Sequence, residues 1–366
     1  MKFMGYRRND GKVGIRNHVL ILATSVCSNK VAEDISHAVE GSTYINNTYG
    51  CCQLGADFEL TKKTIINTGK NPNVGAILVV GLGCEGIEPL DIYEAIKETG
   101  KPVEKITIQE EKGTLNAYAK GVAIARKFVQ QLSLEEKVEC DISEIILGME
   151  CGGSDTTSGL ASNPTCGVCS DMIVDFGGIS ILSETTEFIG AEHVVAKRGK
   201  NEKVSKEIIE LVKKCEEKAM LLGVDIRGGQ PTPGNIVGGI TTIEEKSLGC
   251  IHKSGTKEFQ GVLEYADIPQ EKGLYIMDTP GQDIESITGM VAGGAQIIIF
   301  TTGRGTPTGN PISPVIKLTG NKFTFDSMID NIDFDASKII SGEESINETG
   351  NKLFQEILKV CNGKIT

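Results

Sequence analysis

The sequence contains no tryptophan, and only 5% of its residues are aromatic. A site built on aromatic stacking would therefore depend on a few tyrosines and phenylalanines. Histidine is also scarce at four residues, so a proton-abstracting base could equally be a lysine or a carboxylate. Positive charge is limited as well, since 37 Lys and Arg stand against 49 Asp and Glu, for a formal net charge of −12. That balance argues against nucleic-acid and anionic-membrane partners, which require clustered basic residues.

Long apolar stretches are absent too. No run of about 18 apolar residues occurs, and the N-terminal sequence MKFMGYRRNDGKVG lacks the apolar segment of a signal peptide. We therefore expect a cytoplasmic protein without membrane association. At 366 residues the chain is long enough for two core-forming domains.

Cysteine, in contrast, is abundant, with eleven residues. The number is odd and no export signal accompanies it, so a disulfide framework is not expected. Because cysteine is also a favoured core residue, most of these thiols should be buried and inert. The informative cysteines are those at positions where a core residue would not lie.

The first third of the chain alternates apolar runs with amphipathic segments. Residues 18–24, 76–82 and 103–109 are rich in Val and Ile and predict strands. The segments between and after the first two strands have helical periodicity, and two of them end in Gly, which favours helix termination. The three predicted helices are 27–40, 57–69 and 89–100. Such alternation is typical of a doubly wound, mainly parallel sheet, which binds ligands at the carboxyl ends of its strands.

A charged stretch at 132–143 is the best candidate for a domain boundary, and a second alternating block follows it. We therefore predict an α/β fold of two Rossmann-like doubly wound domains, with an N-terminal domain at 1–135 and a C-terminal domain at 136–366. A long helix fits 202–222, and 226–260 has little periodicity, as irregular functional segments often do. The predicted strands of the second block are 144–149, 178–184, 273–279 and 295–302.

Three cysteines follow predicted strands in Gly-bearing loops. Cys84 and Cys151 lie close after strong strands, and Cys51 follows the weaker strand candidate STYINN. If these strand ends share one rim, the three thiols converge and leave a coordination position open for substrate, as a catalytic metal requires. Thiolates favour iron, iron–sulfur clusters or zinc. The competing interpretation is three small residues that fit tight loops.

The remaining cysteines give weaker signals. Cys166 and Cys169 form a C-x-x-C pair, but the segment also predicts a helix in which this spacing places two small residues on one face. Cys27 lies at a predicted helix N-terminus, where it could be either activated or simply packed. Cys250 is ambiguous.

The loop at 81–86 also matches G-x-G-x-x-G, the fingerprint of a dinucleotide-binding turn. Glu110 and Glu111 lie near the position expected for the ribose-binding acid. Glu88 and Asp91, however, would crowd a pyrophosphate. The motif alone is weak support for a nucleotide.

A second Gly-rich loop at 300–311 follows an apolar strand and carries Arg304 between two glycines. Its amides and guanidinium could bind a carboxylate or phosphate.

His193 and Lys246 are rival candidates for the acid–base residue, with Glu184 as a further polar group at a strand end.

Several ordered motifs make the sequence resemble the altronate/galactarate dehydratase family of sugar-acid hydro-lyases, which also includes sulfolactate sulfo-lyase. The resemblance extends through nearly the whole chain. The motifs are GYRRNDGKVGIRN (5–17), YGC (49–51), GLGCE (81–85), CGGSD (151–155), ILSETTEFIGAEH (181–193), GGITTIEEKSLG (238–249), DTPG (278–281) and FTTGRGTPTGNP (300–311).

This resemblance implies dehydration of a sugar acid such as altronate to a 2-keto-3-deoxy acid, assisted by iron. It implies iron ligation by Cys51, Cys84 and Cys151, either as a single Fe²⁺ or as an iron–sulfur cluster with an open iron, with Mn²⁺ as a further option. Catalysis would fall to His193, Lys246 and Glu184. The matched motifs supply the expected substrate-binding residues: Arg16, Asn17, Glu85, Ser154, Asp155, Thr302, Arg304 and Thr306.

The resemblance implies that full-length enzymes of the family begin with a small β-rich domain. This sequence starts at the motif that follows that domain. We therefore expect a separate small subunit, with this chain as the large catalytic subunit of an oligomer. Two alternatives stay open. One is the large subunit of a sulfolactate sulfo-lyase, which would use the same site on a different leaving group, and the other is a non-catalytic metal- or nucleotide-binding partner subunit.

Overall fold

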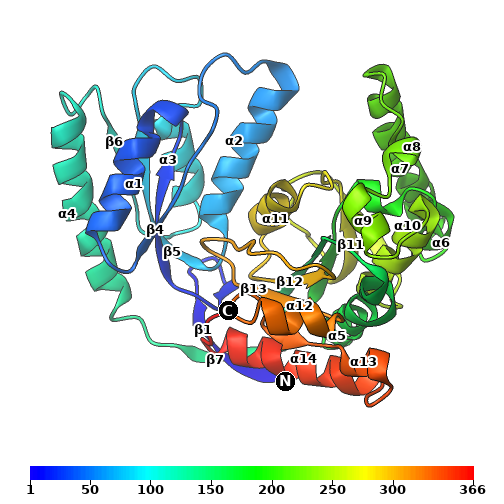
Figure 1. Ribbon diagram of the computed structural model, residues 1–366. Helices are drawn as coiled ribbons and strands as arrows, with labels where there is room; N and C mark the ends of the chain where they lie inside the picture. The colour runs from blue at the N-terminus through cyan, green and yellow to red at the C-terminus, as the bar shows by residue number, and fades with distance from the viewer.

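The computed structural model describes residues 1–366, and it contains two parallel sheets and one small antiparallel sheet (Figure 1). The α/β class with mainly parallel sheets is therefore confirmed. The division at residue 135 and the Rossmann-like assignment of each half stay predictions. None of the helices combines the length and apolar character needed to cross a membrane.

The N-terminal sheet has four parallel strands in the order β4-β3-β5-β6. Alternate residues of β3 pack on opposite faces: Ile21 lies in a core with α1 and α4, and Leu22 lies in a core with α2 and α3. Because both faces are covered, the strands appear in the sequence as continuous apolar runs. The strands are β3 (His18–Ala23), β4 (Ser42–Ile45), β5 (Val74–Gly81) and β6 (Val103–Thr107), and the helices are α1 (Asn29–Ala38), α2 (Gly55–Lys70), α3 (Pro89–Lys97) and α4 (Thr114–Leu132).

The strand order places a switch point at the centre of this sheet. The chain leaves β3 for β4 on one side and then returns to form β5 on the other side. The loops after β3 and β5 therefore diverge, and such a position is where open α/β sheets bind ligands.

The C-terminal sheet has seven strands in the order β10-β11-β9-β8-β12-β13-β14, with every neighbouring pair parallel. β8 lies at its centre, and helices α5 and α14 pack on the face opposite α11. The strands are β8 (Ile146–Gly152), β9 (Ile179–Leu182), β10 (Phe259–Leu263), β11 (Gly273–Met277), β12 (Ile297–Thr302), β13 (Val315–Thr319) and β14 (Phe334–Asp335). The main helices are α5 (Asn163–Asp175), α7 (Glu202–Leu221), α11 (Asp283–Ala292) and α14 (Ile346–Cys361).

The segment 226–260, expected to be irregular, is instead a series of short capped elements. Asp225, Thr232 and Thr242 each accept a hydrogen bond from a first-turn amide with their side chains, which starts a helix that is too short to show periodicity. The elements are α8 (Ile226–Gly229), α9 (Pro233–Val237), α10 (Ile243–Ile251), a 3₁₀ turn (His252–Ser254) and β10. The remaining short helices are α6 (Glu192–Ala196), α12 (Lys322–Ser327) and α13 (Lys338–Ser341).

A small antiparallel sheet covers the predicted boundary. β1 (Lys2–Arg7) pairs with β2 (Val13–Gly14) and with β7 (Val138–Asp141), so the first residues of the chain lie beside the segment that follows α4. The two larger sheets share one core, in which α2 and α3 lie on the same side as α11. Asn71 Nδ2 also donates to the carbonyls of Val291 and Ala295, 2.8 and 3.0 Å away.

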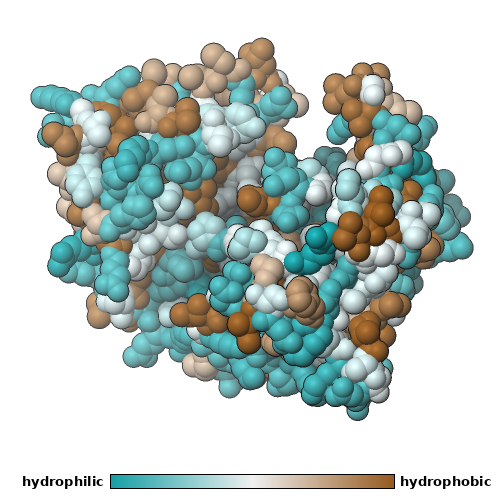
Figure 2. All heavy atoms as spheres, viewed as in Figure 1, coloured by the Kyte–Doolittle hydropathy of each residue, from teal (hydrophilic) through white to brown (hydrophobic).

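The surface is hollowed between the N-terminal half and the projecting end of α7 (Figure 2). The tip of α7 exposes apolar side chains: Leu221 is 87% exposed to solvent, and Leu222 is 83% exposed.

Candidate functional site

A cavity of about 460 Å³ opens at the carboxyl edge of the C-terminal sheet. β8 brings Cys151 to this edge, the turn after β9 brings Glu184, and the loop after β12 brings Arg304. Parallel strands end at a common edge, which is why residues so far apart in the sequence meet here. The cavity is lined mainly by polar side chains, including Cys151, Ser154, Glu184, Lys246, Asp283 and Arg304.

A fully buried lysine, Lys253, contacts two of the residues that line this cavity, Cys151 and Glu184. Lys253 Nζ donates to Glu184 Oε2 and to Cys151 Sγ, the latter at 3.0 Å. Burial alone would lower the pKa of Lys253, but the sulfurs of Cys151 and Cys250 and the Glu184 carboxylate outweigh it and raise the pKa well above its ordinary value. Lys253 is therefore an ammonium ion held inside the protein.

Glu184 is held in position from several sides. Its backbone is left-handed, with a φ of 68°, which is strained for a residue with a side chain and is often associated with functional sites. Its amide donates to Thr279 Oγ1 at 2.6 Å, and its Oε2 accepts the Cys151 amide at 2.9 Å. Burial raises the pKa of Glu184, and Lys253 opposes that rise.

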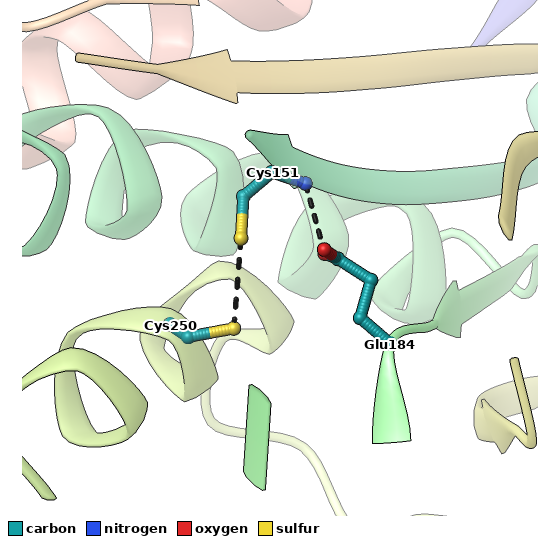
Figure 3. A group of neighbouring side chains, drawn as sticks. All are labelled: Cys151, Glu184 and Cys250. Atoms are coloured by element: carbon teal, nitrogen blue, oxygen red, sulfur yellow. Dashed lines mark hydrogen bonds between the residues drawn. The ribbon is translucent and has the colours of Figure 1, made fainter. Parts of the chain in front are cut away.

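Cys151, Glu184 and Cys250 are the only cluster of three or more potential metal ligands within 4.8 Å of one another (Figure 3). The two sulfurs are 3.7 Å apart, and the Cys250 hydrogen bond together with burial raises the pKa of Cys151 well above its ordinary value. Lys253 already contacts one sulfur and the carboxylate. A divalent cation would have to displace this ammonium, and the thiols would have to lose their protons. Lys253 thus supplies the positive charge that a metal ion would otherwise bring to the cluster.

A second lysine–carboxylate pair, Lys246 and Glu187, lines the cavity. Lys246 Nζ lies 3.0 Å from Glu187 Oε1 and 2.9 Å from Gln230 Oε1. Burial lowers the pKa of Lys246, but the Glu187 carboxylate outweighs this effect and the pKa is raised overall. Glu187 Oε2 is buried without a hydrogen-bond partner although Glu187 lines the cavity. This oxygen therefore has an unused capacity to accept a hydrogen bond or a proton.

Arg304 and the loop after β8 form the other side of the cavity. Arg304 Nη1 donates to the Gly234 carbonyl at 2.8 Å, and the amides of Gly303 and Arg304 both donate to the Gly153 carbonyl. The loops can approach this closely because residue 303 has no side chain: a Cβ there would lie 2.2 Å from Asp155 Cγ. The remaining guanidinium donors can bind an anion.

The predicted substrate-binding residues Asp155, Thr302 and Thr306 lie close to Arg304 in the loops after β8 and β12. Their side chains form hydrogen bonds with other protein groups. Asp155 accepts hydrogen bonds from Thr157 and Asn321. Thr302 Oγ1 accepts the Gly305 amide, and Thr306 Oγ1 donates to Thr308. Ser154, in contrast, lines the cavity.

Three other predicted residues lie outside the cavity. His193 is exposed on α6 and does not line it. Arg16 donates to the backbone carbonyls of Val360 and Lys364 near the C-terminus, and Asn17 donates to Glu135 Oε2. The contacts of Arg16 and Asn17 are those of structural residues.

The three predicted metal ligands do not form a group within 4.8 Å of one another. Cys51 and Cys84 are exposed in the loops after β4 and β5 of the N-terminal sheet, whereas Cys151 is buried in the C-terminal sheet. Glu85, predicted to bind substrate, accepts the amides of Leu82, Gly83 and Cys84 with its two oxygens. These amides are the donors that a pyrophosphate would use. In this Gly-rich loop the Glu85 carboxylate accepts them instead.

The sequence interpretation did not assign roles to Lys253, Glu187 or Asp283. Lys253 lies three residues after Cys250 at the end of α10, and Glu187 lies three residues after Glu184 within a quoted motif. No local pattern connects Lys253 to Glu184, which lies 69 residues earlier in the chain. Asp283 begins α11 and lines the cavity, and burial raises its pKa.

Two protein families match the chain. D-galactarate/Altronate dehydratase, C-terminal, covers residues 142–366, and D-galactarate dehydratase/Altronate hydrolase, second domain, covers residues 5–133. The chain is 40% identical to (2R)-sulfolactate sulfo-lyase subunit beta of Chromohalobacter salexigens, over 100% of this chain and 93% of that protein.

Longer relatives match over almost all of this chain as well. Altronate dehydratase of Bacillus subtilis is 32% identical, over 99% of this chain and 74% of its own length. Galactarate dehydratase (L-threo-forming) of Escherichia coli is 35% identical, over 99% of this chain and 73% of its own length. The dehydratases and the sulfo-lyase are all lyases. The chain therefore belongs to the D-galactarate/altronate dehydratase family of lyases.

Proposed function

We propose that the protein is the catalytic subunit of a lyase acting on a 2-hydroxy acid. The C2–H bond breaks, its electron pair forms the C2=C3 double bond, and the substituent on C3 leaves. The resulting enol then becomes a 2-keto acid. The observation that carries the proposal is the pairing, in one cavity, of Arg304 as an anion site with the Lys246–Glu187 ion pair.

Arg304 is the proposed partner of the substrate carboxylate, since a guanidinium binds a carboxylate with two parallel hydrogen bonds. Ser154, Gly152 and Gly153 line the cavity together with Arg304. This arrangement would direct C2 and C3 toward the lysine–carboxylate pair.

Glu187 and Lys246 are the proposed acid–base pair. Glu187 Oε2 accepts the proton from C2, and the Lys246 ammonium donates a proton to the leaving hydroxyl, which departs as water. A proton then passes from Glu187 to Lys246 across their 3.0 Å contact and restores both groups. Lys246 is thus the acid of the pair, because its raised pKa keeps it charged, and the Glu184–Lys253 pair beneath it contributes fixed charge.

Family resemblance implies iron, which when bound would supply a Lewis acid for the leaving group or the developing enolate. The Cys151–Cys250–Glu184 cluster is a poor fit to a metal because Lys253 occupies it. The exposed thiols of Cys51 and Cys84 have the soft donor chemistry that iron prefers.

A sugar acid such as altronate is the substrate that the cavity favours. Glu184, Glu187 and Asp283 place three carboxyl groups around it, and these would accept hydrogen bonds from sugar hydroxyls but repel a second anionic group. (2R)-Sulfolactate is the second candidate, because the relative that acts on it matches at 40% identity over 93% of its length. That relative is a subunit beta, which supports a separate partner subunit for this chain as well.

The test is an anaerobic assay of the chain, with iron and with its small partner subunit, on altronate, galactarate and (2R)-sulfolactate. Release of a 2-keto-3-deoxy acid from a sugar acid would support the first assignment. Release of sulfite and pyruvate from sulfolactate would support the second. If an iron-loaded complex forms no 2-keto acid from any of the three, the lyase proposal fails.

Replacing Arg304 with Ala should raise KM for the substrate about 10- to 100-fold and change kcat much less. Hydrogen bonds to a charged group contribute about 1.5–3 kcal/mol, and this contact would exist in both the ground state and the transition state. Arg126→Ala, at an exposed position on α4, is the matched control and should leave KM unchanged. A fall in kcat at constant KM would contradict the assignment of Arg304 to substrate binding.

A further inference from the structure

Lys246 has two protein partners in the cavity, and the proposed reaction uses only one of them. Lys246 Nζ lies 3.0 Å from Glu187 Oε1 and 2.9 Å from Gln230 Oε1. Glu187 returns a proton to Lys246, whereas Gln230 takes no part in that transfer. All three residues line the cavity, so the contact between Gln230 and Lys246 belongs to the site and still requires an explanation.

The two contacts together fix the direction of the Lys246 ammonium. A lysine ammonium has three N–H donors and no acceptor. Glu187 and Gln230 accept two of these donors, and no protein group accepts the third. Because the donors are arranged tetrahedrally, fixing two of them also fixes the third. The third N–H is then the one left for the leaving group of a substrate.

An amide suits the position of Gln230 better than a carboxylate would. Burial lowers the pKa of Lys246 and the Glu187 carboxylate raises it, with a net rise. A second carboxylate beside Lys246 would raise this pKa further and would hold back the proton that the reaction requires. The Gln230 oxygen accepts a hydrogen bond but does not take the proton. Gln230 therefore orients the ammonium without making it a weaker acid.

The segment that carries Gln230 is attached to the rim of the cavity. Gln230 lies between α8 and α9 and has an extended backbone, with a φ of −124° and a ψ of 145°. On the α9 side, Asn235 Nδ2 donates to the Ser154 carbonyl at 2.9 Å, and Arg304 Nη1 donates to the Gly234 carbonyl at 2.8 Å. One stretch of chain thus contacts both the proposed acid and the proposed anion site.

The α8 side of the segment is held as well. Arg227 Nε lies 2.6 Å from Glu216 Oε1 of α7, and Arg227 Nη2 lies 3.5 Å from Glu192 Oε1 of α6. With contacts on both sides, the backbone of Gln230 is restricted to a position from which its side chain meets Lys246.

We propose that Gln230 is a positioning residue that holds the Lys246 ammonium toward the leaving group of the substrate. The inference rests on the acid role of Lys246 in the proposed function and adds a residue that acts only through Lys246. Gln230 itself moves no proton. Its removal should slow the departure of the leaving group without weakening substrate binding or preventing removal of the C2 proton.

The first experiment compares Gln230→Met with the wild-type chain, each with iron and the small partner subunit. Methionine has a similar volume but is only a weak acceptor. We expect kcat to fall about 10- to 100-fold, the effect of losing a hydrogen bond to a charged group, with KM changed much less and exchange of C2 deuterium with solvent retained. Gln131→Met, at an exposed position on α4, is the matched control and should keep full activity. Circular dichroism verifies that each variant is folded.

A double-variant cycle separates positioning from a structural role. In a Lys246→Met background, Gln230→Met should change neither the residual rate of product formation nor the C2 exchange, because the group on which Gln230 acts is gone. Three results would overturn the proposal: further loss in the double variant, a wild-type kcat for Gln230→Met, or a rise in KM at constant kcat.

Chemical labelling of Lys246 gives a result that does not depend on the lyase assay. Acetic anhydride, followed by peptide mass spectrometry, should acetylate Lys246 about 10-fold faster in Gln230→Met, because an ammonium that has lost one acceptor gives up its proton more easily. Lys213, which is exposed on α7, is the internal reference and should react equally in both proteins. An unchanged rate at Lys246 contradicts only this inference, whereas a wild-type complex that forms no 2-keto acid contradicts only the proposed function.

Discussion

Glu187→Gln is expected to lower kcat about 10²- to 10⁴-fold, the usual contribution of a positioned proton-transfer group. Glutamine preserves the shape of the side chain and can still accept a hydrogen bond from Lys246, but it cannot take a proton from C2. The buried, unpartnered Oε2 of Glu187 is the atom on which this expectation depends. Glu244→Gln, at an exposed position on α10, is the matched control and should retain full activity.

Exchange of the substrate C2 hydrogen with solvent separates a catalytic role from a structural one. We expect Glu187→Gln to abolish washout of deuterium from C2-deuterated substrate. Lys246→Met should lose product formation but retain measurable exchange, because its base is still present. If Glu187→Gln forms no product yet exchanges C2 deuterium at the wild-type rate, then Glu187 is not the base, and Asp283, a cavity carboxyl group whose pKa burial raises, becomes the next candidate.

Most strands of the two larger sheets could be predicted because helices cover each sheet on both faces, although no prediction covered β10, β13 or β14. A strand buried on both faces is largely apolar, and β5 and β12, which are buried along their whole length, contain only apolar residues and glycine apart from Thr301 and Thr302. The short helices α8 and α9 could not be predicted from periodicity, since neither is long enough to complete two turns.

The composition of the site was harder to predict than the strands. In the sequence interpretation, Cys51, Cys84 and Cys151 converge only if the strands they follow end on one rim. Strand order and sheet membership decide which rims coincide, and neither can be derived from a local pattern. Cys151 lies in a different sheet from the other two, whereas Cys27, which gave a weaker signal, follows the strand beside theirs.

Lys253 shows a second limit of local patterns. A lysine between His252 and Ser254 is typical of an exposed polar turn, yet this side chain is completely buried. Its partner Glu184 lies 69 residues earlier in the chain. Only the tertiary structure brings together two charges that compensate each other's burial.

Lys253→Met should therefore reduce the free energy of unfolding by about 3–5 kcal/mol, the usual result of removing one partner of a buried ion pair. Methionine fills a similar volume, so the loss would come mainly from Glu184, left buried without its cation. The same substitution at Lys322, which forms an exposed pair with Asp326, is the control and should change stability little. Urea denaturation of the three proteins measures the difference.

Adding Glu184→Gln to Lys253→Met tests the cause of that loss. If the unpaired carboxylate is responsible, the double variant should be more stable than Lys253→Met alone, because a neutral amide can be buried at lower cost. The raised pKa of Lys253 also sets the alkaline limit: while Glu184 is ionised, the contribution of the pair is lost only as the pH rises through the folded-state pKa of Lys253, which lies above that of an unfolded-state lysine. A double variant less stable than Lys253→Met would mean that Glu184 stabilises the fold through its bonds to the Cys151 amide rather than through Lys253.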